Sequence, residues 1–323
     1  MVTILVTGCA GFIGTHLCTL LLNKGYAVIG VDNFDPFYNR SIKEANLATC
    51  TKHPAFSFYE LDITTGLDPI KEQSIQAVIH LAAKAGVRPS IEDPAGYLHV
   101  NIAGTQKVHE FMQARAIHKL IFASSSSVYG NNKKIPFSET DNVDNPISPY
   151  AFTKKACELM NYTAHHLYHM DIINLRFFTV YGPGQRPDLA IHQFVKKIAN
   201  NQPLVLFGDG QTARDYTYID DTVAGIYSAL KYCLQNTNIY TTINLGNNNP
   251  VKLNDLVDII YIAMGKEKNI DHVPMQPGDV DITYADISKA TTWLNYKPAT
   301  SLPEGIGKFI AWFNATERKD NMS

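Results

Sequence analysis

Two side chains in the middle of the chain could perform acid–base chemistry. Tyr150 and Lys154 lie four residues apart in the segment SPYAFTKKACE. In a helix this spacing puts both side chains on one face. A phenol titrates near pH ~10 when it is unperturbed, and a neighbouring ammonium group favours its anion. The sequence therefore predicts that Tyr150 acts as a base at neutral pH with Lys154 beside it.

A row of four serines, Ser124 to Ser127, is a second concentration of polar groups. It stands in FASSSSVYG, between an apolar run and an aromatic–glycine turn. Four small polar residues are too few to form a disordered tract. We therefore interpret the row as hydroxyl groups at the end of a strand.

A glycine-rich segment near the amino terminus suits a phosphate group. VTGCAGFIGTHL carries Gly8, Gly11 and Gly14 between the first predicted strand and the first predicted helix. Glycines permit a tight turn there, and they let backbone amides and the positive end of the helix approach a pyrophosphate. The segment predicts a dinucleotide site.

Acidic residues at the ends of predicted strands fit the rest of a dinucleotide. Asp32 ends the second predicted strand in VIGVDN, where a carboxylate binds the ribose diol of adenosine. With an acid there and no arginine beside it, we expect NAD rather than NADP. Asp62 and the turn His80–Ala83 end further strands on the same edge, where we expect the adenine and the second ribose.

These groups need a scaffold, and the first half of the chain alternates strand and helix patterns. The apolar runs TILVTG, AVIGVDN, FSFYELD, AVIHLAA, KLIFASS and DIINLRFFTVYG are separated by helical patterns, with long helices expected at about 94–116 and 150–169. Alternation of this kind predicts the α/β class, with a Rossmann-type doubly wound parallel sheet buried on both faces.

After about residue 180 the regular alternation of strand and helix patterns ends. Turn signals rich in Gly, Pro and Asn surround short segments, as in GPGQRPD, FGDGQ and LGNNNP. We expect a smaller, interleaved carboxyl-terminal substrate lobe at 181–216 and 246–323. The NAD-binding domain is then expected at 1–180, with returning segments at about 217–245.

Composition narrows the class of protein further. With 323 residues, 45% of them hydrophobic, the chain can bury a large core. A net charge of -2 gives no basic surface for nucleic acid and no polybasic membrane tether. Five cysteines without CxxC spacing favour neither disulfides nor a metal site, and they fit a reducing cytoplasm. We see no signal peptide and no membrane-length apolar run, so we expect a soluble protein.

In combination, these segments resemble the extended short-chain dehydrogenase/reductase family, the NAD-dependent epimerases and dehydratases of nucleotide sugars. The resemblance covers nearly the whole chain through the glycine loop, HLAAKAGVRPSIEDP, NIAGT, FASSSSVYG, SPYAFTKKACE, RFFTVYGP, RDYTYIDD and PGDVDITYAD. It implies bound NAD, a UDP-sugar between domain and lobe, and a homodimer in which the two long helices pair across a two-fold axis. It also implies that Tyr150 is the acid–base, that Lys154 binds the nicotinamide ribose, and that Ser125 bridges sugar O4 and the tyrosine.

The same resemblance implies two sets of binding residues. The expected cofactor contacts are Gly8, Gly11, Phe12, Ile13, Gly14, Asp32, Asn33, Asp62, Ile63, Leu81, Ala82, Ala83, Asn101, Tyr150 and Lys154. The expected substrate contacts are Arg88, Ser125, Ser126, Ser127, Tyr150, Thr179, Arg186, Arg214, Gln276 and Asp279.

The serine row separates this chain from relatives with other chemistry. Sugar 4,6-dehydratases resemble T-D-E-V-Y-G and UDP-xylose synthases resemble T-S-E-V-Y-G, whereas this chain has Ser126 and Ser127 at the acidic positions. Thr179 in RFFTVYG stands where UDP-glucose 4-epimerases carry an asparagine. Uncharged donors suit a substrate that itself carries a carboxylate, because a glutamate would repel it. We therefore expect Ser126, Ser127 and Thr179 to hold a sugar carboxylate.

Arginines are the expected partners of the remaining anionic groups. Arg186 and Arg214 suit the diphosphate or the sugar acid, because a guanidinium fork matches such oxygens. The resemblance puts Arg214 on the diphosphate, and Gln276 with Asp279 near the nucleotide ribose. For Arg88 the sequence leaves open whether it lines the cleft or forms a structural ion pair.

The residues and the resemblance together favour one activity. The chain most resembles UDP-glucuronate 4-epimerases, which would interconvert UDP-glucuronate and UDP-galacturonate through a 4-keto sugar with tightly bound NAD. The alternatives are a UDP-glucose or UDP-N-acetylhexosamine 4-epimerase, a UDP-glucuronate decarboxylase, and an NAD-binding regulatory protein without turnover. Fold alone does not choose among them.

Overall fold

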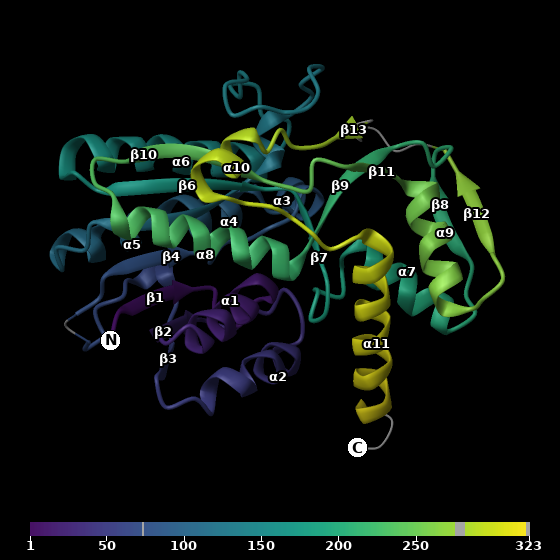
Figure 1. Ribbon diagram of the computed structural model, residues 1–323, viewed down its shortest axis with the longest axis horizontal. Helices are drawn as coiled ribbons and strands as arrows, with labels where there is room; N and C mark the ends of the chain where they lie inside the picture. Colours follow the sequence, from purple (N-terminus) through teal and green to yellow (C-terminus); the bar gives the residue numbers. More distant parts are fainter. Residues whose placement is uncertain (73, 275–281, 321–323) are drawn as a thin grey trace.

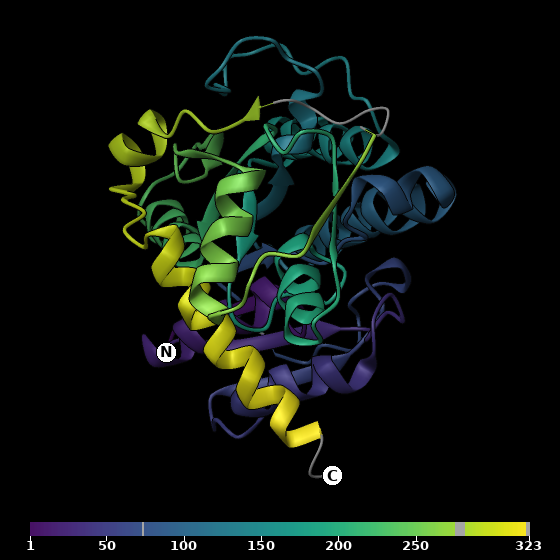
Figure 2. The ribbon, with the colours of Figure 1, turned by 90° about the vertical axis from the view of Figure 1, so that its right-hand side faces the viewer.

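A seven-stranded parallel sheet forms the centre of the molecule. The computed structural model describes residues 1–72, 74–274 and 282–320 (Figures 1 and 2). In chain order the strands of this sheet are β1 (Thr3–Thr7), β2 (Ala27–Asp32), β3 (Phe56–Glu60), β4 (Ala77–His80), β5 (Lys119–Ser125), β6 (Asp171–Phe177) and β10 (Tyr240–Leu245). They lie side by side as β10-β6-β5-β4-β1-β2-β3. This order confirms the Rossmann-type class, and its direction reverses between β1 and β4, where such sheets bind ligands.

Helices cover both faces of the sheet. The first face carries α1 (Phe12–Asn23), α2 (Arg40–Thr51) and α8 (Ile219–Gln235), and the second carries α5 (Gly104–Ala114) and α6 (Pro149–Tyr168). Ile4 and Val6 belong to the apolar cluster with α1 and α8, whereas Leu5 belongs to the cluster with α5 and α6. Successive residues of a strand face opposite ways, so β1 is buried on both sides.

The helix expected at about 94–116 is divided in the structure. It comprises α4 (Pro94–Tyr97), a π-helical segment η2 (Leu98–Ala103) and α5, and it is preceded by α3 (Val87–Glu92). The Asn101 carbonyl oxygen accepts a hydrogen bond of 2.5 Å from the Thr105 hydroxyl. A side chain thus competes for a carbonyl group of the backbone ladder, which accounts for the wider turn.

The rest of the chain forms a smaller lobe beside the sheet. One sheet of the lobe contains β7 (Thr179–Tyr181), β9 (Ala213–Tyr218), β11 (Pro250–Lys252) and β13 (Ile282–Thr283), and another pairs β8 (Leu204–Phe207) with β12 (Ile270–Val273). Its helices are α7 (Ala190–Ala199), α9 (Leu253–Met264) and α11 (Leu302–Asp320); α10 (Ser288–Leu294) packs on α8 and β10. Figure 1 shows β8, β12, α7 and α9 together at the end opposite β10.

The lobe and the sheet are interleaved along the chain. After β9 the chain returns to the sheet as α8 and β10, and then leaves it again for β11 and α9. Two short 3-10 turns, η1 (Ile63–Thr65) and η3 (Ser126–Tyr129), follow β3 and β5.

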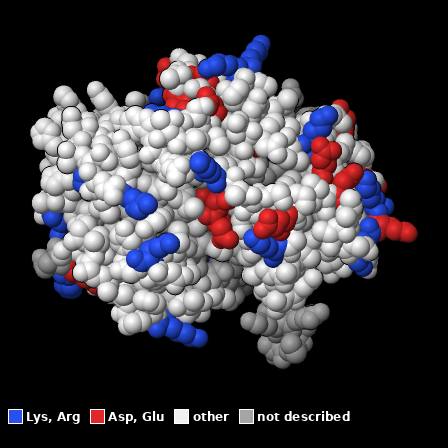
Figure 3. Space-filling model, viewed as in Figure 1, with Lys and Arg blue, Asp and Glu red and all other residues white. Residues whose placement is uncertain are grey.

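The distribution of surface charge and the character of the helices describe the outside of the molecule. On the face drawn in Figure 3, basic and acidic side chains are interspersed rather than gathered by sign. In the described part of the chain, no helix has both the length and the apolar character needed to cross a bilayer.

Candidate active site

A cavity of about 550 Å³ opens at the carboxyl end of the central sheet. Its walls come from the β1–α1 turn, the ends of β2, β3, β4 and β5, the start of α6, and the segment from β6 to residue 189. Chain segments that are far apart in sequence therefore meet where the strand order reverses.

The glycine loop forms one wall because larger residues would not fit. Gly8 has a φ of +73°, and a Cβ on it would lie 2.7 Å from the Ala82 nitrogen. A Cβ on Gly14 would lie 2.1 Å from the Gly8 carbonyl oxygen. The amino-terminal end of α1 thus lies directly against the loop, and together they suit a pyrophosphate.

Two carboxylates line the same half of the cavity. Asp32 accepts hydrogen bonds from the backbone amides of Ala10 (3.1 Å) and Phe34 (2.8 Å), and burial raises its pKa. Burial also acts to raise the pKa of Asp62, but hydrogen bonds from Thr64 and Asn33 lower it below its usual value. Both carboxyl groups are therefore held in place by the backbone or by neighbours beside the cavity.

Tyr150 and Lys154 lie at the far end of the cavity, next to β5. The Lys154 ammonium donates to the Ala123 carbonyl oxygen at 2.7 Å, and burial lowers its pKa to about 8. Burial raises the pKa of Tyr150, while a hydrogen bond from Ser125 and the charge of Arg186 act in the opposite direction. Burial is the largest effect on this pKa, and it acts against the anion that a neighbouring ammonium group alone would favour.

Hydroxyl groups and one arginine line the same cavity as Tyr150. The Ser125 oxygen accepts from the Ser127 amide at 3.1 Å, which begins η3 and turns Ser126 and Ser127 toward the cavity. Thr179 lines the cavity from β7. The Arg186 guanidinium also lines it, and it is held by Asp188 through bonds of 3.0 and 2.7 Å.

The structure brings most of the expected residues together, but not all. Of the described ones, those outside the cavity wall are Asn101, Arg88 and Arg214. Asn101 is buried beneath the wall, the Arg88 guanidinium lies 5.9 Å from the Phe207 ring centroid, and Arg214 donates to the Ala213 carbonyl oxygen. Gln276 and Asp279 lie outside the described residues.

Some wall residues were not foreseen from the sequence. They include Phe37, Tyr38, Lys43, Lys84 and Leu189. Lys43 is the clearest, since its ammonium donates to the Asp35 carbonyl oxygen at 2.7 Å and lies 4.6 Å from the Tyr38 ring centroid. A lysine on a mainly polar helix resembles a solvated charge, so only the fold reveals that it is buried.

Comparison with known proteins gives a consistent result. The family model for GDP-mannose 4,6-dehydratase matches residues 5–309. The UDP-glucuronate 4-epimerase of Thermodesulfobacterium geofontis is 45% identical over 312 residues, which are 95% of each chain. UDP-glucuronate 4-epimerase 4 of Arabidopsis thaliana is 41% identical over 97% of this chain and 75% of its own length.

Solved structures agree in fold as well as in sequence. The UDP-glucuronic acid 4-epimerase of Bacillus cereus, crystallised with UDP-glucuronic acid and NAD, superposes with a TM-score of 0.90 at 37% identity. The match covers 97% of this chain and 99% of that one.

Proposed function

Because this chain belongs to the GDP-mannose 4,6-dehydratase family of NAD-dependent epimerases and dehydratases, we propose that it is a UDP-glucuronate 4-epimerase. It interconverts UDP-glucuronate and UDP-galacturonate. One observation carries the choice within the family. The acidic side chains of the described cavity wall, Asp32, Asp35 and Asp62, follow β2 and β3. The β5 end and the segments after it contribute uncharged serines, Thr179 and Arg186 to the wall that also contains Tyr150.

The residues present fit NAD. The glycine loop has no side chains at Gly8, Gly11 and Gly14, so its backbone amides can be approached at the start of α1. Asp32 is held by a backbone amide at the end of β2, and Lys154 lines the cavity together with Tyr150. These groups would hold the pyrophosphate, the adenosine ribose and the nicotinamide ribose, respectively. When bound, NAD accepts the hydride from C4 of the sugar and returns it.

Tyr150 supplies the acid–base step. Its oxygen takes the proton from the C4 hydroxyl group as that carbon becomes a ketone, and it gives the proton back after the sugar has turned over. Tyr150 must itself be deprotonated first, and the Ser125 hydroxyl and the Arg186 charge favour this loss. The sugar turns about its diphosphate linkage between the two halves, so the opposite face of C4 is reduced.

The hydroxyl-lined end of the cavity also protects the intermediate. A 4-keto uronic acid is a β-keto acid, which loses carbon dioxide when its carboxylate bond aligns with the ketone. Ser126, Ser127 and Thr179 would hold the carboxylate out of that alignment by hydrogen bonds. They supply no acid for the protonation of C5, so retention of the carboxylate follows from the composition of this wall.

The proposal is tested by incubating the purified protein with UDP-glucuronate, without added NAD, and following the anomeric protons by NMR. We expect UDP-galacturonate at a stable equilibrium, since NAD should copurify. A UDP-pentose would instead indicate a decarboxylase. No change with UDP-glucuronate but conversion of UDP-glucose would indicate a neutral-sugar epimerase, and no turnover of any UDP-sugar would favour a regulatory protein.

We further propose that the enzyme is a homodimer. Phe152, Leu159 and Tyr162 are exposed large side chains on the outer side of α6, and Ile91 and Leu98 add to them from α3 and η2. Leu159 and Ile91 keep 57% and 62% of their surface. Exposed apolar side chains on α6 and on its neighbours α3 and η2 suit a second copy of the chain across a two-fold axis.

We also propose a cytoplasmic location for the protein and a division of the chain into an NAD-binding part and a UDP-sugar-binding part. All five cysteines are free and buried thiols, which is the state that a reducing cytoplasm maintains. We assign NAD binding to 1–180 with 217–245, and UDP-sugar binding to 181–216 with 246–323. The turn of the sugar then takes place between these two parts.

A further inference from the structure

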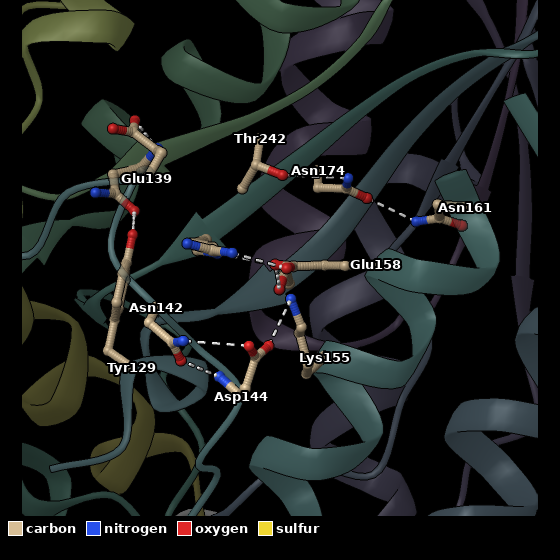
Figure 4. Close-up of polar contacts among 12 residues, drawn as sticks. Tyr129, Glu139, Asn142, Asp144, Lys155, Glu158, Asn161, Asn174 and Thr242 are labelled. Atoms are coloured by element: carbon tan, nitrogen blue, oxygen red, sulfur yellow. Dashed lines mark hydrogen bonds and ion pairs between the residues drawn. The ribbon is translucent and has the colours of Figure 1, made fainter. Parts of the chain in front are cut away.

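The inner side of α6 is unusually polar for a helix that packs on a buried sheet. Three inward residues bond to β5 or β6: Lys154 to the Ala123 carbonyl, Glu158 to Ser124 and Arg176, and Asn161 to Asn174. Tyr150, one turn before Lys154, lies next to Ser125 at the end of β5. Figure 4 shows the part of α6 that carries Glu158 and Asn161, with the Asn161 side chain bonded to Asn174. Directional bonds thus hold the helix on the sheet.

Glu158 is the most constrained member of this set. It accepts a bond of 2.6 Å from Ser124, and bonds of 2.9 and 2.8 Å from Nε and Nη2 of Arg176. Glu158 and Arg176 each expose only 3% of their surface. The Arg176 guanidinium also lies 4.8 Å from the Tyr129 ring centroid. Glu158 therefore fastens α6 to two strands at once.

A shift of α6 along the sheet would break this arrangement. Moving the helix by one residue would separate Glu158 from Arg176 and leave both charges buried without a partner. Such unpaired charges are strongly destabilising, by several-fold more than an exposed pair is stabilising. The ion pair thus selects one position of α6, as buried polar groups select register in other folds.

We propose that Glu158 is a positioning residue for the reaction: through its bonds to Ser124 and Arg176, it sets the position of α6 at which Tyr150 lies beside Ser125 and Lys154 reaches the Ala123 carbonyl oxygen. Neither Glu158 nor Arg176 lines the cavity, so neither touches a ligand there. The inference rests on the proposed function, because it needs an activity to measure. An inactive wild-type protein would reject the function, whereas an active one permits the test below.

Glu158 also contributes charge to the same site. Burial lowers the pKa of Lys154, and Glu158 is one of two groups that act to raise it. The titratable groups around this ammonium are His80 from β4, Cys157, Glu158 and Tyr150 from α6, and beyond them Arg176 from β6. Variants can separate position from charge, because Ser124 bonds to Glu158 but carries no charge.

The main test removes the ion pair as a whole. The double variant Glu158→Leu with Arg176→Met replaces two charges by apolar groups of similar size, a change that proteins tolerate when both partners go together. We expect cooperative unfolding as in the wild type, a kcat lower by roughly 30-fold and a KM within about threefold, because a small displacement of catalytic groups costs rate rather than binding. A folded double variant with wild-type kcat would overturn the proposal.

A matched control lies at the other end of the same strands. Lys119 on β5 and Asp171 on β6 form an ion pair at 2.7 Å, with side chains 17% and 6% exposed. Lys119→Met with Asp171→Asn should leave kcat within about twofold, because this pair is remote from the cavity. If this control lost as much kcat as the Glu158 and Arg176 double variant, loss of any ion pair on β5 and β6 would lower kcat. That result would reject a special role for Glu158.

Two milder variants keep the proposal testable if the double variant does not fold. Ser124→Ala removes one strand-to-helix bond and keeps every charge; we expect kcat to fall about fivefold with an unchanged pH profile. Glu158→Gln removes a charge that favours protonated Lys154, so the alkaline limb of kcat should move to lower pH. If both variants keep wild-type kcat and pH profile, Glu158 has no positioning role.

Discussion

The Asn101 side chain donates a hydrogen bond of 2.9 Å to the Thr153 hydroxyl, which ties the π-helical segment η2 to the first turns of α6. The same amide group bonds both the nitrogen and the carbonyl oxygen of Lys84, on the loop that lines the cavity. Asn101, which we expected to contact the cofactor, is therefore buried and joins the loop to α6.

Replacing Asn101 should weaken the fold and the site together. Asn101→Ala removes three hydrogen bonds at a buried position, so we expect the free energy of unfolding to fall by about 2 to 3 kcal/mol. Urea unfolding measures this change. The fraction of protein that copurifies with NAD should also fall, and an unchanged NAD content would show that the loop holds its shape without Asn101.

Removing the phenolic oxygen should stop the reaction without harming the protein. Tyr150→Phe keeps the ring that packs edge-on against Tyr97 at 6.2 Å. We expect kcat to fall by about a thousandfold, since acid–base catalysis by one group contributes on that scale. The NMR assay measures this, with a melting temperature to confirm folding. Substantial residual turnover would mean that another group moves the O4 proton.

A negative charge in the serine row should act against the anionic substrate. Ser127→Glu adds a carboxylate to the wall opposite the sugar acid, and we expect kcat/KM for UDP-glucuronate to fall at least about 10-fold. Ser127→Gln is the matched control, because it has the same size without the charge and should lose less. Equal losses would attribute the effect to bulk, and retained activity in both would remove Ser127 from carboxylate binding.

Removing the buried ammonium of Lys154 should stabilise the folded chain while abolishing activity. The folded pKa of about 8 lies below the unfolded value near 10.4, so the unfolded state binds more protons between these values. At pH 7 the buried ammonium lowers the free energy of unfolding by the full free-energy equivalent of this pKa difference, about 3 kcal/mol. Above pH 8 this destabilisation declines. Lys154→Met should therefore raise the free energy of unfolding by about 1 to 2 kcal/mol at pH 7, after the loss of the bond to Ala123.

The pH dependence provides the check on Lys154. Urea midpoints of the Lys154→Met variant and the wild type should differ more at pH 7 than at pH 10. The stabilisation by the substitution shrinks because the wild-type lysine becomes neutral at the higher pH. Lys155→Met, at the next position on α6 and 3.8 Å from Asp144, should show neither gain nor loss of that size. A constant gain at both pH values would exclude a protonation origin.

A charge on the exposed side of α6 should dissociate the proposed dimer. Leu159→Glu puts a carboxylate within the apolar surface formed with Phe152 and Tyr162, and sedimentation should show a monomer. Ile262→Glu is the control, since Ile262 is an equally apolar and 79% exposed residue on α9. A wild-type monomer would reject the dimer at once.

The sequence predicted those parts of the site that depend on local pattern. The glycine loop, Asp32 and the pair Tyr150 and Lys154 each carry their signal within a few residues, and the strand–helix alternation puts them at one edge of a sheet. The burial that raises the pKa of Tyr150 could not be predicted, because distant segments of the chain provide it.

Interactions between residues far apart in the chain could not be predicted from the sequence either. A buried arginine in an apolar strand, such as Arg176, needs a partner, but nothing in the sequence identifies Glu158 as that partner. The wide turn at Leu98–Ala103 was also missed, because one extra residue in a helical turn barely alters the apolar period. These features follow from contacts between elements rather than from neighbours in the chain.

The place of β10 at the edge of the central sheet has a consequence for how the chain is made. β6 remains an open edge until Tyr240–Leu245 pairs with it, and the sheet face beneath α8 stays uncovered until Ile219–Gln235 has been made. During synthesis, the amino-terminal half therefore cannot complete its sheet before residue 245 has emerged from the ribosome. A chain halted near residue 180 would present both an unpaired strand and an apolar face, and would be held by chaperones or lost to aggregation.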